Sequence, residues 1–272
     1  MIKKIVKKAK SVLLKSTSEQ VFFVSYPKTG GTWLKFLLNR FFVLHFDLGE
    51  ENYSVDLEKI RMLSSLVPEV VWTHEDAYLI KESGTVNPTP EAMLNRKAPI
   101  APYDKCIFLV RDPRDVVVSY YHQVNKRSKT TFFSGSIDDF VLDPVYGIER
   151  VLSYYKLYEQ THHLYPNFCL VQYEDLLVET QRELTRVLEF IGIRHFNEAH
   201  LERVVSEGQA DNMRKLEKSK AVSGMNSFGS DRDSLKVRKA KTGSFKEELL
   251  PETVEKMNEI IEKYGHPFGY GK

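Results

Sequence analysis

At residues 26–33 the chain reads Tyr26-Pro27-Lys28-Thr29-Gly30-Gly31-Thr32-Trp33. A strand-like apolar run over 21–25 precedes this turn, and apolar residues at helical spacing follow it from Leu34. A strand, a glycine turn and a helix N-terminus form an anion cradle, because the first helical N–H groups lack intrahelical partners and the helix dipole favours negative charge. Lys28 adds a positive charge, and Thr29 and Thr32 add hydroxyl donors. The turn therefore predicts a phosphate or sulfate site.

The turn differs from the Walker A loop of ATP- and GTP-binding proteins. That loop places Lys and Ser or Thr after its last glycine, where the hydroxyl binds Mg²⁺. Here Lys28 precedes both glycines, and Gly-Lys-Ser/Thr occurs nowhere in the chain. The sequence therefore disfavours an ATP-Mg²⁺ kinase or a GTPase. A strand, turn and helix without a ligand is the remaining structural alternative.

Composition is ordinary for a globular protein: 272 residues, 42% hydrophobic and 28% charged. This length is compatible with a single α/β domain. A net charge of +2 is too small to indicate nucleic acid binding. Cys106 and Cys169 lie in apolar strand-like runs, which predicts buried, reduced thiols. No Cys/His cluster has zinc spacing, so we expect no metal.

The first 18 residues form a basic extension, amphipathic over 1–15. This extension lacks the apolar core and cleavage site of a signal peptide. The sequence contains no run of about 18 apolar residues, so we expect no membrane-spanning helix. Two interpretations remain open for the basic extension: peripheral contact with an anionic membrane, or a helix packed on the domain.

Strand-like and helix-like patterns alternate along the chain. We expect strands over Val21–Ser25, Glu69–Thr73, Lys105–Val110 and Phe168–Tyr173. We expect helices over Thr32–Phe46, Arg114–Lys126, Tyr146–Leu164, Asp175–Ile191 and Pro251–Tyr264, with Asp112-Pro113 as a helix start. Continuously apolar strands are typical of a parallel sheet buried on both faces. The alternation predicts an α/β fold of three layers, α/β/α, with ligands at the carboxyl ends of the strands.

The segment 206–242 is long, polar and basic, and it lacks a clear apolar period. Such a segment inside a compact domain is often a lid or a binding loop. Disorder is the alternative. We favour a lid, because the segment runs into a second basic, glycine-containing motif, Arg238-Lys239-Ala240-Lys241-Thr242-Gly243-Ser244-Phe245-Lys246.

Three further groups lie at expected strand ends. Arg111 follows the strand ending at Val110 and can contact a phosphate through two N–H groups, with Ser119 two helical turns further on. His74 follows the strand Glu69–Thr73, where a side chain that titrates near neutrality can act as a general base. Tyr173 ends the last strand. Taken singly, each has a structural alternative: an ion pair, a structural His or a core Tyr.

Taken together and in this order, the motifs resemble those of the soluble sulfotransferases that use PAPS, 3′-phosphoadenosine 5′-phosphosulfate. The resemblance runs from about Phe22 to Phe245. The turn 26–33 resembles the 5′-phosphosulfate loop, Phe108–Asp115 with Ser119 resembles the 3′-phosphate motif, and 238–246 resembles the loop Arg-Lys-Gly-x-x-Gly-Asp-Trp-Lys. This family resemblance implies a P-loop-like sulfotransferase fold in one domain, 1–272, and a cytoplasmic protein.

By position, the resemblance implies a role for each site residue. The 5′-phosphosulfate would be held by Lys28, Thr29, Gly30, Gly31 and Thr32, and the 3′-phosphate by Arg111, Ser119, Arg238, Lys239 and Ala240. The adenine would contact Trp33 and Tyr173. His74 would be the catalytic base, and Lys28 would stabilise charge on the leaving oxygen.

Several positions depart from the family pattern. Trp72 replaces a Lys before Thr-His, Ala240 replaces the first glycine of the last motif, and Ser244-Phe245 replaces Asp-Trp. If Ala240 needs a positive φ, it costs on the order of 1 kcal/mol. Ala210 replaces a Phe that would stack on the adenine. The family's dimer motif, Lys-x-x-x-Thr-Val, is not matched, so the oligomeric state stays open.

The implied reaction is transfer of the sulfuryl group of PAPS to a hydroxyl, or an amine, of a small-molecule acceptor, with PAP as the product and no metal. A kinase-like phosphotransferase and a non-catalytic nucleotide-binding module are the alternatives. We expect the acceptor pocket to use Asp47–Ser65, Ala77–Tyr103 and 206–234. Candidate wall residues are Tyr53, Glu75, Asp76, Tyr78, Phe132 and Phe133.

Overall fold

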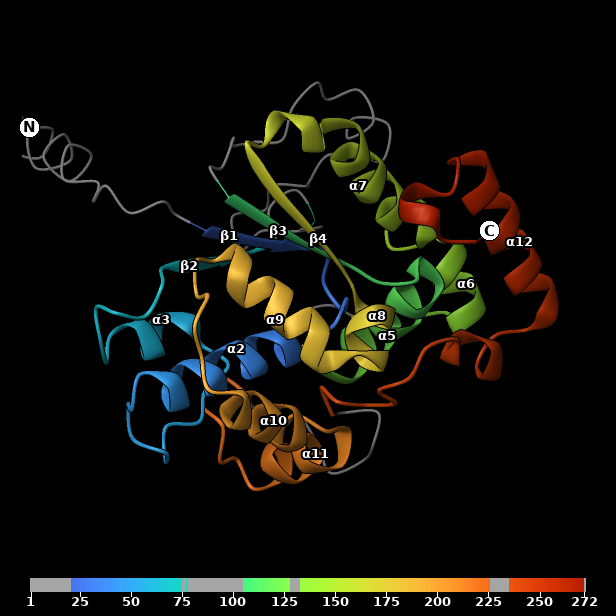
Figure 1. Cartoon of the computed structure of the whole chain (residues 1–272). Helices are drawn as coiled ribbons and strands as arrows, with labels where there is room; N and C mark the ends of the chain where they lie inside the picture. Colours follow the sequence, from blue (N-terminus) through green and yellow to red (C-terminus); the bar gives the residue numbers. More distant parts are fainter. Residues whose placement is uncertain (1–20, 75–76, 78–104, 128–132, 226–234, 272) are drawn as a thin grey trace, which may run out of the picture.

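A central parallel sheet organises the chain (Figure 1). The computed structural model describes residues 21–74, 77, 105–127, 133–225 and 235–271. Across these residues the sheet has the order β2-β1-β3-β4. The strands are β1 (Val21–Ser25), β2 (Val70–Thr73), β3 (Lys105–Val110) and β4 (Asn167–Gln172). All pairs are parallel, so the four carboxyl ends meet at one edge of the sheet.

Helices cover both faces of the sheet (Figure 1). Ile107 and Leu109 of β3 pack into a cluster with α2 (Gly31–His45) and α9 (Thr180–Phe190), whereas Cys106 and Phe108 face α7 (Ile148–Thr161). Successive strand residues point to opposite faces, so this division follows from the period of two. The predicted three-layer α/β fold is confirmed.

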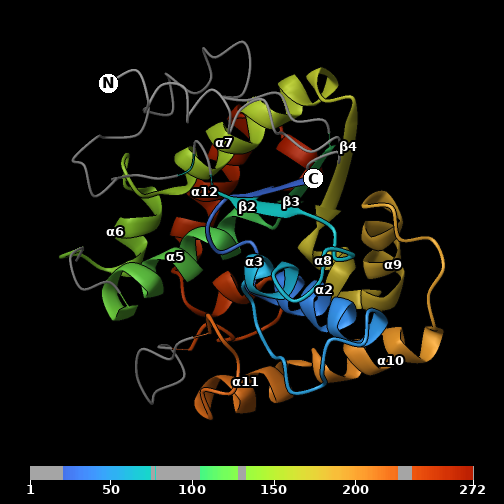
Figure 2. The same ribbon diagram turned by 90° about the vertical axis from the view of Figure 1, so that its left-hand side faces the viewer.

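Further helices extend these layers. They are α3 (Leu57–Arg61), α5 (Pro113–Arg127), α6 (Ile137–Leu142), α8 (Tyr173–Val178), α10 (Glu198–Glu207), α11 (Ala210–Lys218) and α12 (Pro251–Lys263). In Figures 1 and 2, α10 and α11 lie beyond α2 on the side away from the sheet. A third cluster joins α5, α6, α7 and α12 beside the sheet.

The bounds of β1 and β3 are those predicted, and α5 begins at Pro113 as Asp112-Pro113 predicted. The single helix predicted over 175–191 is wrong. The chain forms α8 and α9, separated at Glu179, whose backbone is not helical (φ −126°, ψ 53°). Cys106 and Cys169 are buried free thiols, as expected.

The segment 206–242, which shows no clear apolar period in the sequence, holds the helix α11 in its first part. Met213 and Glu217 of α11 are both buried, and the Glu217 carboxylate accepts the backbone N–H groups of Lys236 (2.7 Å) and Val237 (3.2 Å). Because the buried face of α11 carries the charged Glu217 where an apolar residue would be expected, the sequence does not show the apolar period of a helix here. Residues 226–234 and the basic extension 1–18 lie outside the described residues. The helices that the structure describes include none long and apolar enough to span a membrane.

Candidate functional site

The turn between β1 and α2 is a preformed cradle. The Thr29 hydroxyl donates to the Tyr26 carbonyl at 2.9 Å, and both residues are fully buried. The proton of this hydroxyl is therefore committed to the turn, and Thr29 can offer an anion only its backbone N–H. Lys28 (φ 79°) and Gly30 (φ 102°) have left-handed backbones. For Lys28 this conformation costs roughly 1–2 kcal/mol, so the surrounding structure must hold it.

Aromatic rings pack so closely against both glycines of the cradle that neither position has room for a side chain. A Cβ on Gly30 would lie 2.5 Å from the Tyr173 ring, and one on Gly31 would lie 1.9 Å from the Trp72 ring. Any larger residue would therefore displace a ring. The glycines were predicted from anion binding alone, and the structure adds close packing as a second reason.

Tyr173 brings several predicted site residues together. It is the first residue of α8, at the end of β4, and is 5% exposed. Its ring meets the Trp33 ring edge-on with centroids 5.8 Å apart, and the Arg111 guanidinium lies 4.4 Å from its centroid. The Trp33 indole N–H donates to the Gly208 carbonyl at 2.8 Å. Burial raises the pKa of the Tyr173 phenol, so this group remains a neutral donor.

Arg111 is a buried cation at the end of β3, only 9% exposed. Its Nη2 donates to the Lys241 carbonyl at 3.0 Å and lies 3.5 Å from the Asp115 carboxylate. Its Nε is buried, and no described residue provides a hydrogen-bond acceptor for it. Ser119 lies on α5 beyond it and is half-buried. An under-satisfied buried guanidinium fits a bound anion.

The basic loop 238–246 is held beside Arg111 by Asp115. The Asp115 carboxylate accepts hydrogen bonds from the Gly243 N–H, the Ser244 hydroxyl and the Phe245 N–H at 2.8–3.1 Å. The Arg214 guanidinium of α11 donates to the carbonyls of residues 237–239. Ala240 has a positive φ of 53°. An alanine in this left-handed conformation costs on the order of 1 kcal/mol relative to glycine, as expected from the sequence.

Two cations assigned to the 3′-phosphate carry carboxylate partners. Arg238 lies 2.8 Å from Glu248, and Lys239 lies 2.9 Å from Glu248 and 3.0 Å from Glu247. His122 Nε2 completes the cluster at 2.7 Å from Glu248. Burial opposes ionisation of Glu248, but hydrogen bonds from His122, Lys239 and Arg238 lower its pKa to about 2. Glu248 therefore orients these cations at the loop.

His74 lies just past β2 with both ring nitrogens engaged. Nδ1 lies 2.7 Å from the Ser25 carbonyl, which only accepts, so Nδ1 carries the proton and Nε2 has the lone pair. The Trp72 indole N–H donates to Nε2 at 3.3 Å. Burial, together with the charges of Lys35 and Lys28, lowers the pKa of His74 to about 4. The ring is therefore neutral at physiological pH and can accept a proton.

The segments predicted to form the acceptor pocket are partly described. A pocket of about 680 Å³ lies between β2, α2 and α3 and uses residues of 55–62 together with Trp72 and Gly224. Tyr53 instead stacks on Phe36 and lies under the Arg40 guanidinium, and Phe133 packs on Phe140. Glu75, Asp76, Tyr78 and Phe132, with most of 77–103, lie outside the described residues. The described residues contain no cluster of metal-binding side chains.

Sequence reasoning assigned no role to Asp115, Arg214 and Glu248, although all three hold the basic loop. Only Asp115 carried a usable signal, since it lies four residues after Arg111 at the start of an expected helix. The partners of Arg214 and Glu248 depend on how the chain folds back.

The family profile described as "Sulfotransferase domain" matches residues 18–269. The chain therefore belongs to the sulfotransferase family, and its reaction is sulfuryl transfer to small-molecule acceptors. It is 26% identical over 264 residues to a flavonol sulfotransferase-like protein of Flaveria bidentis, covering 92% of this chain and 82% of the relative. It is 21% identical over 262 residues to an amine sulfotransferase of Oryctolagus cuniculus, covering 90% and 80%.

Solved structures share the fold at lower identity. A mouse sulfotransferase in complex with PAP superimposes with a TM-score of 0.58 at 19% identity, covering 93% of this chain and 87% of that one. Retinol dehydratase in complex with androsterone and PAP superimposes with a TM-score of 0.56 at 19% identity, covering 90% and 80%. These likenesses support the sulfotransferase fold of the chain.

Proposed function

We propose that the donor bound by this chain is PAPS and that the cradle, Arg111 and the basic loop hold its two anionic ends. The observation that carries this proposal is the convergence of Gly30, Trp33 and Arg111 around Tyr173. One anion fits at the N-terminus of α2, and a second fits at the buried Arg111 guanidinium, whose Nε has no acceptor among the described residues. The PAP in the related structures agrees with such a donor.

In this proposal, cationic side chains and backbone N–H groups bind the anionic groups of the donor, and aromatic side chains bind its adenine. PAPS, when bound, supplies the sulfuryl group. Lys28 and the first N–H groups of α2 provide preorganised positive charge where the leaving oxygen develops negative charge. Arg111, Ser119, Arg238, Lys239 and the backbone at Ala240 bind the 3′-phosphate, and Trp33 and Tyr173 bind the adenine. Glu247 and Glu248 keep Lys239 and Arg238 in place.

His74 is the proposed general base. Its Nε2 takes the proton of the acceptor hydroxyl, and the Ser25 carbonyl keeps the required tautomer through Nδ1. No group in this scheme requires a metal ion. The acceptor is a small hydroxyl- or amine-bearing molecule, and the protein acts in the cytoplasm.

Two measurements test the donor. Adenosine 3′,5′-bisphosphate should raise the melting temperature, whereas ATP with Mg²⁺ should have little effect. Arg238→Ala should weaken PAP binding by calorimetry, and unchanged affinity would refute its phosphate role. A stronger shift with ATP-Mg²⁺ would favour a phosphotransferase instead.

A turnover assay with labelled PAPS and a panel of phenols, sugars and amines tests the base. His74→Ala should lose roughly 10²–10⁴-fold in kcat and keep its PAP affinity. Near-wild-type turnover of this variant would remove His74 from the mechanism. Binding of PAP without turnover on any acceptor would favour a non-catalytic module.

A further inference from the structure

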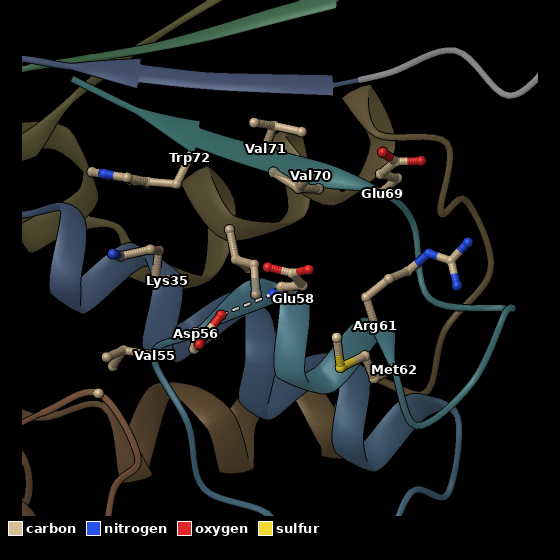
Figure 3. A pocket seen from close by; sticks show the side chains of 12 residues that line it. Lys35, Val55, Asp56, Glu58, Arg61, Met62, Glu69, Val70, Val71 and Trp72 are labelled. Carbon is tan, nitrogen blue, oxygen red and sulfur yellow. Dashed lines mark hydrogen bonds between the residues drawn. The ribbon is translucent and has the colours of Figure 1, made fainter. Parts of the chain in front are cut away.

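Lys35 is a cation that the proposed mechanism does not use. It lies on α2 one turn after Gly31, and its Nζ lies 4.4 Å from the centroid of the Trp72 ring (Figure 3). None of the described residues offers it a hydrogen bond or an ion-pairing carboxylate. Burial and the nearby charge of Lys236 lower its pKa to about 8, opposed by Asp56. Lys35 is half-buried, and an ammonium group partly removed from water usually has a polar partner, so a lysine that rests on an aromatic face needs an explanation.

Trp72 is held in one position by its neighbours. Lys35 lies on its face, Phe23 meets it edge-on with centroids 4.1 Å apart, and Gly31 leaves room for its six-membered ring. Its indole nitrogen can only donate, and it donates to His74 Nε2 at 3.3 Å. The lysine, the indole and the imidazole therefore form one continuous set of contacts ending at the proposed base.

Two of these three residues, Lys35 and Trp72, also line the pocket beside β2. Lys35 and Trp72 line one end of this pocket, and Arg61 and Glu69 lie toward the other end (Figure 3). A molecule in the pocket would therefore contact Trp72 directly, and Trp72 separates it from His74. Movement of the indole N–H away from Nε2 would leave the lone pair available to a hydroxyl.

Among the residues that the structure describes, charged groups from two elements act on His74. Lys35 faces it from α2 and Lys28 faces it from the cradle, and both disfavour the imidazolium. From β1 it meets the neutral Ser25, and from β2 the neutral Trp72. Among the described residues, Lys35 is thus a cation outside the cradle whose charge lowers the pKa of His74 and favours the neutral imidazole.

We propose that Lys35 and Trp72 form a positioning pair for His74: the ammonium fixes the indole, and the indole N–H orients the imidazole until the acceptor hydroxyl replaces it at Nε2. In the step that follows, the acceptor O–H bond breaks, its proton bonds to Nε2, and the oxygen retains the electron pair for attack on sulfur. This inference rests on the proposed role of His74.

The test compares Lys35→Met, which keeps the apolar stem, with Lys35→Arg, which keeps the charge. Lys35→Met should lose roughly 10- to 100-fold in kcat, with PAP affinity unchanged, whereas Lys35→Arg should stay near wild type. Lys59→Met is the matched control, because Lys59 lies on nearby α3 and, within the described part of the chain, its ammonium bonds to the Ser223 hydroxyl alone. It should leave turnover unchanged.

The pH profile of kcat/KM supplies a readout that a structural role would not move. The wild-type rate should fall as pH rises through about 8, where Lys35 loses its charge. Lys35→Arg should move this alkaline limb upward. Lys35→Met should instead move the acid limb upward from about 4, because removing a cation favours the imidazolium, which cannot act as a base.

Trp72→Phe is the second variant, since it keeps an aromatic ring and removes the N–H. It should lower kcat and keep PAP affinity. The inference is overturned if both Lys35 variants keep the wild-type pH limbs, or if Trp72→Phe turns over like wild type, while His74→Ala is inactive. If His74→Ala itself turns over normally, the proposed base fails and this inference falls with it.

Discussion

The carboxylate of Asp115 accepts a hydrogen bond from the Ser244 hydroxyl at 2.9 Å, although the two residues are 129 positions apart in the chain. The same carboxylate also accepts the N–H groups of Gly243 and Phe245. The two stretches that carry the proposed 3′-phosphate cations are therefore one structural unit. Substitution of the buried Asp115 should therefore lower both the free energy of unfolding and the affinity for the donor.

Asp115→Asn tests this unit. The amide loses the negative charge and part of the accepting capacity, so the free energy of unfolding should fall by about 1.5–3 kcal/mol and PAP binding should weaken. Urea unfolding and calorimetry measure the two effects. Asp138→Asn is the control, because Asp138 accepts a single backbone bond at an exposed site. Full PAP affinity in Asp115→Asn would show that the loop does not depend on this carboxylate.

Gly31→Ala tests the packing of the cradle. The added methyl group would lie 1.9 Å from the Trp72 ring, and overpacking of this kind costs about 1–3 kcal/mol. Denaturant unfolding should show this loss in the single variant and a much smaller loss in the Trp72→Ala background. Equal losses in both backgrounds would mean that Trp72 does not cause the strain.

Ala240→Gly should stabilise the protein. Ala240 has φ 53°, a conformation that glycine adopts without steric cost, so the free energy of unfolding should rise by up to about 1 kcal/mol. Ala221→Gly, in an exposed connection, should lower it by about 0.4–1 kcal/mol, because glycine gains freedom in the unfolded chain. A loss of stability in both variants would contradict the backbone argument.

Glu248→Gln should change how stability depends on pH. Burial raises the pKa of Glu248, but bonds from His122, Lys239 and Arg238 outweigh it and lower the pKa to about 2. The ionised form therefore stabilises the fold above the ordinary pKa near 4.5, by on the order of 3 kcal/mol, and this contribution is lost as pH falls toward 2. Urea midpoints of wild type and variant should differ most above pH 4.5, and the difference should shrink steadily below that pH and vanish only as pH reaches about 2. A constant difference would remove Glu248 as the source.

Several features of the site were predictable because they depend on short stretches of chain. Continuous apolar runs predicted β1 and β3 with correct bounds, and Asp112-Pro113 predicted the start of α5. Tyr173 was predicted as the last residue of a strand, and it lies directly after β4 as the first residue of α8, at the carboxyl edge of the sheet. The helix α11 was missed because its buried Glu217 breaks the apolar period and finds its partners across a turn.

The sequence by itself determined a parallel α/β sheet with a glycine turn between strand and helix at residues 26–33, because strand patterns, glycine backbones and helix starts are local properties. Only the tertiary structure decided that Tyr173 closes on Gly30, that Asp115 holds the basic loop, and that Lys35 lies on the Trp72 ring. These contacts join residues far apart in the chain, and they exist only because packing of the core brings the strand ends together.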